Sequence, residues 1–249
     1  MSSFNEKLKK ITLKELLSLI VVLFLIQYLL NSLNIVQIDS SWIYIIVIFY
    51  FIFKTKTEFF SIRGDVLEVF QFNILKSIFA VVILNIFFSY GMLYFSDLIL
   101  NISSDLNLFN SAFAGGLIAT IIISPISEEL IFRGVFLNRL RLAVPLTFAI
   151  LISSLLFAAL HSFGSIFSAF IFAICVAILY LKTDNIFVPM LAHFLNNLFA
   201  EIFVGLDTNN VLFTNDLVMG VMSVLAIVSF VLILISIVKE LNTISHNNS

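Results

Sequence analysis

Runs of about 20 apolar residues recur along the chain, and a run of this length can cross a hydrocarbon core about 30 Å thick. Hydrophobic residues make up 61% of the 249 residues and charged residues only 11%, whereas a globular protein carries about 25% charged residues. We therefore predict an all-α fold, a polytopic transmembrane helical bundle that forms a single integral membrane domain over residues 1–249.

Polar breaks between the apolar runs define about eight predicted spans. The second is short for a membrane crossing, and the stretch 54–74 that follows it mixes charged residues with phenylalanines, as in an amphipathic segment at the membrane interface. The N-terminal run is too long for the core of a signal peptide, so we interpret it as the first span. The predicted spans are 16–35, 41–53, 75–96, 110–132, 145–161, 165–181, 186–204 and 217–238.

The distribution of charge tests this number of spans. If the N-terminus lies in the cytoplasm and the spans alternate in direction, all 13 Lys and Arg residues fall on the inner side. Such a positive-inside pattern favours eight spans with both termini in the cytoplasm. The outer loops then carry only acidic charges, at Asp39, Asp97, Asp105, Asp207 and Asp216.

The net charge and the cysteine content exclude several classes of function. The formal net charge of −2 argues against a nucleic-acid partner. The single cysteine, Cys175, lies in an apolar run and allows neither an intrachain disulfide nor a cysteine-based metal cluster. The partner that follows from composition alone is the lipid bilayer.

Polar residues inside the predicted spans carry the functional signal, because ionisable side chains in a membrane are costly and mark functional sites. Two of the three histidines of the chain lie in these spans. The polar residues of interest are Glu128, Glu129 and Arg133 near the end of the fourth span, His161 in the fifth, and His193, Asn197 and Glu201 in the seventh.

Helical spacing separates the two glutamates. Glu129 and Arg133 are four residues apart, so they share a helix face in the favourable order for an ion pair. Glu128 is turned about 100° away and has no local partner, which leaves it free to face a cavity. Alternatively, both glutamates belong to a buried ion network that carries no chemistry.

The connection between the fourth and fifth spans brings Glu128 towards His161. With a turn near Ala143 and a rise of about 1.5 Å per residue, the two side chains reach similar depths in an antiparallel hairpin, within roughly 5 Å. We therefore expect the carboxylate and the imidazole to face each other across two helices.

The seventh span contributes a second polar face. His193 and Asn197 are four residues apart and lie on the same side of a helix, while we expect Glu201 to extend towards the outer interface. Pro125 and Pro189 lie shortly before the two polar clusters. Each proline removes a backbone hydrogen bond and is expected to loosen its helix beside the site.

A carboxylate, two imidazoles and an amide in an apolar cavity suit hydrolysis by an activated water. Glu128 with His161 can hold and deprotonate the water, and His193 with Asn197 can donate hydrogen bonds to the developing oxyanion. No serine or cysteine pairs with a histidine by these spacings, which argues against a covalent nucleophile. We expect that no cofactor is required. As an alternative, Glu128, His161 and His193 can bind Zn²⁺ and leave one position for water.

The order of these residues resembles the motifs of the CPBP family of intramembrane proteases. The family comprises the CAAX proteases and bacteriocin-processing enzymes and is also called the Abi family. Each motif is weak alone, but three in this order in a polytopic chain are specific. The motifs are Glu128-Glu129-x-x-x-Arg133, Phe157-x-x-x-His161 and His193-x-x-x-Asn197, and they lie in a core at 110–204.

The resemblance implies an intramembrane endopeptidase similar to CAAX prenyl protease 2. In it the carboxylate and the first histidine activate water, and the second histidine and the asparagine form the oxyanion hole. Members of the family have been classed both as metalloproteases and as glutamate-dependent proteases. The catalytic residues are then Glu128, His161, His193 and Asn197, with Glu129, Arg133 and Phe157 in supporting positions.

The short chain, rich in Ile, Phe and Asn, is typical of a multi-pass protein of a bacterial cell membrane. Bacteria generally lack prenylated CAAX proteins, and bacterial relatives are associated with bacteriocin self-immunity and with peptide pheromone maturation. We therefore expect an unprenylated peptide or membrane-protein substrate. The alternative is a non-catalytic membrane immunity or scaffold protein that uses the polar cluster only for structure.

Overall fold

A computed structural model describes residues 3–34, 41–56, 59–100, 116–161, 166–207 and 211–247. These ranges contain helices and no β-strand, which confirms the predicted all-α fold. Parts of three predicted spans, at 35, 110–115 and 165, lie outside the described residues, as do Asp39 and Asp105.

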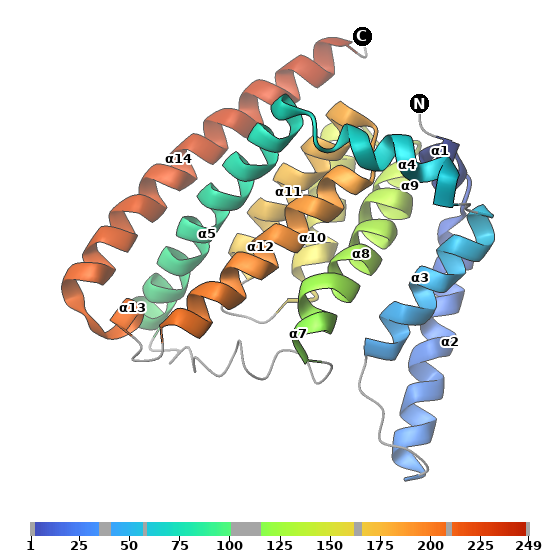
Figure 1. Cartoon of the computed structure of the whole chain (residues 1–249), viewed down its shortest axis with the longest axis horizontal. Helices are drawn as coiled ribbons and strands as arrows, with labels where there is room; N and C mark the ends of the chain where they lie inside the picture. The colour runs from blue at the N-terminus through green and yellow to red at the C-terminus, as the bar shows by residue number, and fades with distance from the viewer. Residues whose placement is uncertain are drawn as a thin grey trace.

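The N-terminal half supplies one side of the bundle. The helices α2 and α3 lie side by side at its edge, and the long helix α5 crosses the bundle next to the core (Figure 1). The helices of this half are α1 (Ser3–Leu8), α2 (Leu13–Ser32), α3 (Ser41–Thr55), α4 (Phe59–Glu68) and α5 (Phe72–Leu100).

The C-terminal half contains the helices that carry the predicted polar residues. Its first helical segment runs from Gly116 to Leu140 and comprises α7 (Gly116–Ile118), the π-helix η1 (Ala119–Ile123), α8 (Ser124–Glu129), the π-helix η2 (Leu130–Leu137) and α9 (Asn138–Leu140). The remaining helices are α10 (Leu146–Ala158), α11 (Ile166–Thr183), α12 (Phe187–Leu206), α13 (Val211–Thr214) and α14 (Asp216–Asn247).

Each predicted span coincides with a helix or a helical segment, and both termini lie at the same end of the bundle (Figure 1). Within the described part of the chain, four helices are long and apolar enough to cross a membrane, namely those over Leu13–Ser32, Phe72–Met92, Ile166–Thr183 and Asp216–Ile244. The helices α3, α10 and α12 contain shorter apolar stretches. Eight crossings therefore remain a prediction, whereas the all-helical membrane bundle is established.

The helical segment that carries the two glutamates differs from the predicted fourth span. It continues to Leu140 instead of ending at residue 132, and it widens into π-helix before Pro125. Proline has no N–H and its ring crowds the carbonyl four residues earlier, which disfavours a regular α-turn there. The N–H of Ser124 accordingly bonds to the carbonyl of Ala119, five residues back.

The expected loosening of the seventh span at Pro189 is wrong. The helix α12 begins at Phe187, so the proline lies in the first turn. Backbone nitrogens in a first turn have no acceptor within the helix, and a proline there removes no hydrogen bond. His193 therefore sits on a regular helix.

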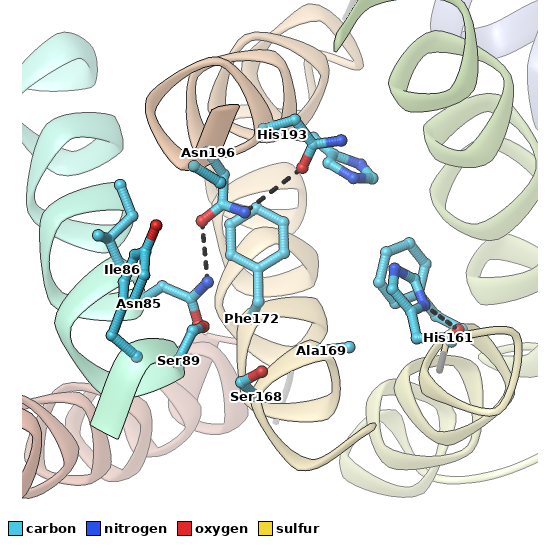
Figure 2. Close-up of a pocket in the computed structure, with 13 residues that line it drawn as sticks. Asn85, Ile86, Ser89, His161, Ser168, Ala169, Phe172, His193 and Asn196 are labelled. Carbon is cyan, nitrogen blue, oxygen red and sulfur yellow. Dashed lines mark hydrogen bonds between the residues drawn. The ribbon is translucent and has the colours of Figure 1, made fainter. Parts of the chain in front are cut away.

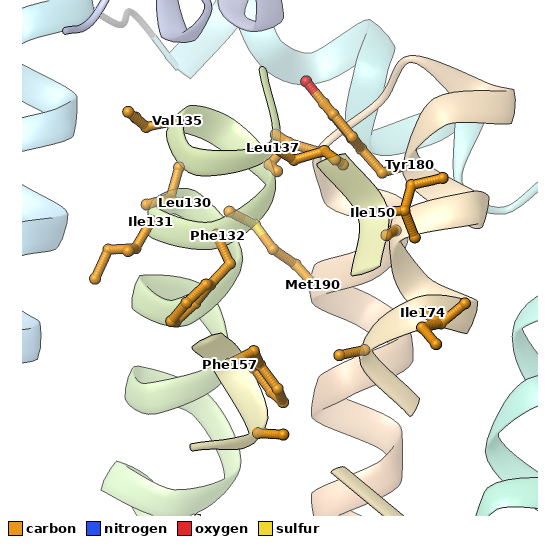
Figure 3. Packing of buried hydrophobic residues seen from close by; sticks show 14 of the residues in the cluster. Leu130, Ile131, Phe132, Val135, Leu137, Ile150, Phe157, Ile174, Tyr180 and Met190 are labelled. Carbon is orange, nitrogen blue, oxygen red and sulfur yellow. The ribbon is translucent and has the colours of Figure 1, made fainter. Parts of the chain in front are cut away.

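The core of the bundle is apolar and is built largely around the segment η2. Phe132 contacts Phe157 of α10 edge-to-face, with ring centroids 5.3 Å apart. Leu130, Val135 and Ile150 are buried in the same cluster (Figure 3). By contrast, large apolar side chains on the outside of α2, α5 and α14 are exposed, as expected for helices that face lipid.

A polar cluster closes the end of the bundle at which both termini lie. The amide of Asn5 donates to the carbonyl of Asp184, and Lys9 forms an ion pair with the Asp184 carboxylate at 2.8 Å. Asn185 donates to the carbonyl of Asp65 in α4 at 2.7 Å. The predicted amphipathic stretch 54–74 thus contains a helix that packs at the end predicted to face the cytoplasm.

Helices α5 and α14 approach closely at Gly91. A methyl group at this position would overlap the side chain of Ala226 on α14. The glycine therefore permits a helix separation that any other residue prevents, as small residues do at membrane helix interfaces.

We predict that Gly91→Ala destabilises the protein by about 1–3 kcal/mol, the usual effect of overpacking a filled interface. The matched control is Gly220→Ala on α14, where an added methyl group meets no atom within 4 Å. Thermal unfolding in detergent compares the two variants. Equal midpoints would show that the close contact between α5 and α14 is not a determinant of stability.

Candidate active site

The predicted ion pair between Glu129 and Arg133 is present and deeply buried. The guanidinium Nη1 lies 3.1 Å from the carboxylate Oε1, and the two side chains expose 0% and 1% of their surface. This contact confirms the pairing that the spacing of four residues predicts. A charge at this depth requires a compensating partner, because an unpaired one carries a large desolvation penalty.

Arg133 also joins the surrounding helices. Its Nη2 donates to the carbonyl of Ala173 on α11 at 3.0 Å, and its guanidinium carbon lies 4.7 Å from the ring centroid of Phe157. Asn138, which follows η2, donates to the carbonyls of Arg133 and Gly134. The arginine is therefore fixed by an ion pair, a hydrogen bond and a cation–π contact.

Glu129 is more than the local partner of the arginine. Its Oε1 also accepts a hydrogen bond from Nδ1 of His193 on α12, at 2.9 Å. A carboxylate can only accept, so the histidine nitrogen that faces it carries the proton. The contact fixes the imidazole and leaves Nε2 pointing away from Glu129, 3.9 Å from Oε2 of Glu128.

The prediction that Glu128 lacks a local partner is wrong. The hydroxyl group of Ser124, one helical turn earlier, donates a hydrogen bond to Oε1 of Glu128. Tyr44 of α3 hydrogen-bonds to the same serine. The other carboxylate oxygen, Oε2, is buried and has no hydrogen-bond partner among the described residues. One oxygen of Glu128 is thus held by a hydrogen bond, and the other is not.

His161 follows the end of α10, and its orientation is also fixed. Its Nδ1 lies 3.0 Å from the carbonyl of Phe157, and its ring packs against the Phe157 ring with centroids 4.7 Å apart. The carbonyl can only accept, so Nδ1 is the donor and Nε2 carries the lone pair of the neutral ring. The approach of His161 to Glu128 stays a prediction of the hairpin geometry.

A cavity of about 130 Å³ lies beside these groups. His161 and His193 lie in its wall with Phe157 between the two rings, and Figure 2 shows the two histidines across the cavity from each other. A cavity needs roughly 10–15 Å³ to hold one water, so this volume accommodates several. The described residues that line it include neither Glu128 nor Glu201. Glu128 lies next to the cavity wall, because its Oε2 is 3.9 Å from Nε2 of His193.

Asn197 lines the cavity one turn after His193, which confirms that the two residues share a face. Its amide nitrogen donates to the carbonyl of Thr120 in η1 at 2.9 Å. A side-chain amide has two N–H groups, so one remains for a ligand in the cavity.

Several polar residues of the site are missing from the sequence-based set. Two come from helices that carry no motif, one lies four residues before the first motif, and one lies at a variable position within the third. Each is a polar residue within an apolar helix, which is a signal that the sequence does contain. The residues are Tyr44, Asn85, Ser124 and Asn196.

The alternative zinc ligands are Glu128, His161 and His193. Among the residues that the structure describes, no three His, Cys, Asp or Glu side chains are grouped to hold a metal ion. His193 uses Nδ1 to bind Glu129, and His161 uses Nδ1 to bind a backbone carbonyl. Each ring keeps Nε2, the nitrogen that can bind a metal when Nδ1–H is held by an outer acceptor, so Zn²⁺ at Glu128, His161 and His193 stays the alternative prediction.

Comparison with known proteins identifies one domain. Residues 110–199 match a family model described as "Type II CAAX prenyl endopeptidase Rce1-like". The matched region contains all three sequence motifs. Four motif residues within it line the cavity, namely Phe157, His161, His193 and Asn197. No curated protein and no solved structure matches the chain.

We predict that Arg133→Met lowers the free energy of unfolding by about 3–5 kcal/mol, because it leaves the Glu129 carboxylate buried without its counter-ion. The matched control is Lys182→Met, which removes the half-exposed pair between Lys182 and Glu240 and should change stability by less than about 1 kcal/mol. Unfolding in mixed detergent micelles measures both. Similar losses in the two variants would contradict a supporting role for the buried pair.

Proposed function

Since residues 110–199 match an Rce1-like family model, we propose that the chain is a CPBP-family intramembrane protease that hydrolyses a peptide bond of a membrane-associated peptide or protein. One observation carries the chemistry. The Nδ1 atoms of both site histidines are tied to acceptors, so each ring has only Nε2 to offer a ligand. These nitrogens accompany a buried Glu128 oxygen that lacks a partner among the described residues.

Glu128 and His161 are proposed to activate water. A water bound to Oε2 of Glu128 would donate its second proton to Nε2 of His161. As the water oxygen attacks the peptide carbonyl carbon, Glu128 takes the first proton as a general base. The same proton is then delivered to the amide nitrogen of the leaving group when the carbon–nitrogen bond breaks.

His193 and Asn197 are proposed to stabilise the oxyanion that forms on the carbonyl oxygen. Asn197 would donate the N–H that is not used by Thr120. His193 would donate from Nε2, which requires a ring protonated on both nitrogens because Nδ1–H already binds Glu129. Donors that are fixed before the reaction are effective because they need no reorganisation as charge develops.

Glu129, Arg133 and Phe157 are proposed to support these groups without reacting. Glu129 orients His193, Arg133 balances the Glu129 charge, and Phe157 packs against both histidine rings. Displacement of a reacting group by about 1 Å can lower a rate about 100-fold. The rigidity of this supporting set is therefore part of the proposed mechanism.

The proposed substrate is an unprenylated peptide or membrane protein of a bacterial cell, and the proposed biological roles are bacteriocin self-immunity or peptide maturation. The cavity of about 130 Å³ holds water molecules but not a peptide. Substrate binding must therefore widen it. A prenylated CAAX peptide is the comparison substrate, because the family model describes an endopeptidase that acts on such proteins.

A non-catalytic membrane immunity or scaffold protein is the second candidate. The observation that favours it is the fully buried chain of charges from Arg133 through Glu129 to His193. Such a network can fix the packing of three helices with no reaction at all. In that case the unpaired oxygen of Glu128 would have no role.

We predict that Glu128→Gln lowers cleavage at least about 100-fold while the protein remains folded, because glutamine keeps the shape but cannot act as a base. The control is Glu201→Gln, a half-buried carboxylate on α12 that does not line the described cavity. Fluorogenic peptides in proteoliposomes report cleavage, and thermal melting reports folding. A folded Glu128→Gln variant with full activity would refute the protease mechanism and favour the scaffold.

The proposed mechanism uses no metal ion, so we predict that exhaustive chelation leaves cleavage unchanged. Activity before and after chelation is measured together with the metal content of the purified protein. Stoichiometric zinc whose removal abolishes cleavage, and whose return restores it, would replace water activation by Glu128 with the zinc-dependent alternative.

A further inference from the structure

Asn85 lies in the wall of the candidate active site, although it belongs to no motif and lies outside the matched region 110–199. It is carried by α5, which packs along α12, and it exposes only 4% of its surface. Figure 2 shows its side chain directed at Asn196 of α12. The N-terminal half of the chain therefore supplies a buried amide to the cavity.

Asn85 begins a chain of side-chain amides that ends at a fixed acceptor. Asn85 Nδ2 lies 2.8 Å from Asn196 Oδ1, and Asn196 Nδ2 lies 3.4 Å from Asn197 Oδ1. Asn197 Nδ2 in turn lies 2.9 Å from the carbonyl of Thr120. Three amides thus connect α5, through α12, to η1.

The direction of this chain follows from its last member. The carbonyl of Thr120 can only accept, so Asn197 must present its nitrogen there and its oxygen to Asn196. Asn196 must then present its oxygen to Asn85. It follows that Asn85 donates through its nitrogen and that Oδ1 is the atom left over.

This oxygen is buried and has no hydrogen-bond partner among the described residues. Buried polar atoms in native proteins are nearly always paired, so an exception requires an explanation. A peptide substrate supplies backbone N–H donors, and the active-site residues described above offer no other amide oxygen free to accept one. When a peptide binds in this cavity, one of its backbone N–H groups can donate the missing hydrogen bond to Oδ1 of Asn85.

We propose that Asn85 is a substrate-binding residue whose Oδ1 accepts a backbone N–H of the bound peptide. Its Nδ2 simultaneously positions Asn197 through Asn196. The inference rests on the proposed peptide-bond hydrolysis and adds to it a peptide-backbone subsite on α5. Because two amides separate Asn85 from Asn197, the contact is made to a residue near the scissile bond rather than to the scissile bond itself.

The test uses binding as well as cleavage. The probe is a dye-labelled peptide with a C-terminal CAAX sequence, with or without a farnesyl group, and its backbone amides are N-methylated one at a time. N-methylation removes a single N–H donor. Binding is measured with protein in nanodiscs that carries Glu128→Gln, and cleavage is measured with the Glu128 protein.

We expect N-methylation at one position to weaken binding about 10-fold, the effect of losing one hydrogen bond. This loss should disappear when Asn85→Ala is added, because the acceptor is already absent. Asn85→Asp retains an acceptor oxygen and should remain sensitive to N-methylation. Both Asn85→Ala and Asn196→Ala should lower kcat, since each releases Asn197.

Ser77→Ala on the exposed side of α5 is the control for substitution in this helix, and thermal melting identifies variants that fail to fold. Equal sensitivity to N-methylation in folded proteins with and without the Asn85→Ala substitution would overturn the subsite. Binding that depends on Asn85 without any cleavage would support the subsite and overturn the proposed hydrolysis. Absence of binding by every form of the probe would overturn both.

Discussion

The carboxylate of Glu129 is the group on which the rest of the site depends. It is fully buried and receives hydrogen bonds from Arg133 of η2 and from His193 of α12. A carboxylate at this depth is tolerated only when its charge and lone pairs are matched. The same two bonds set the distance between the helices and the orientation of the imidazole. The electrostatic requirement of one residue therefore fixes the geometry of its neighbours.

The irregular helix around the two glutamates meets a second requirement. A proline beside a functional cluster disturbs the α-helix, and the chain widens into π-helix before Pro125. Within α8, Ser124 then holds one oxygen of Glu128, while the adjacent Glu129 turns towards α12. Two neighbouring glutamates thereby acquire different environments. Glu129 binds Arg133 and His193, whereas Oε2 of Glu128 has no hydrogen-bond partner among the described residues.

Local patterns in the sequence predicted what depends on neighbours along the chain. Hydropathy predicted the helices, and the spacing of four residues predicted the pair between Glu129 and Arg133. The contact between Glu129 and His193 spans 64 residues and depends on how two helices rotate against each other, which periodicity does not determine. The same reasoning overlooked Ser124 as a partner of Glu128, although the two residues are four apart and share a helix face. The predicted span 186–204 begins within one residue of the observed helix start at Phe187. The error at Pro189 was to expect a lost hydrogen bond from a proline that lies in a first turn.

The N-terminal half completes the site instead of serving only as a membrane anchor. Tyr44 of α3 hydrogen-bonds to the serine that holds Glu128, and Asn85 of α5 begins the amide chain that ends at Thr120. Both contacts act on groups of the matched region from outside it. The three motifs therefore carry the residues of the proposed chemistry but do not position them alone. An amide or hydroxyl group in a membrane span must form its hydrogen bonds within the protein. Tyr44 and Asn85 find such partners in the interior of the bundle, around the candidate site.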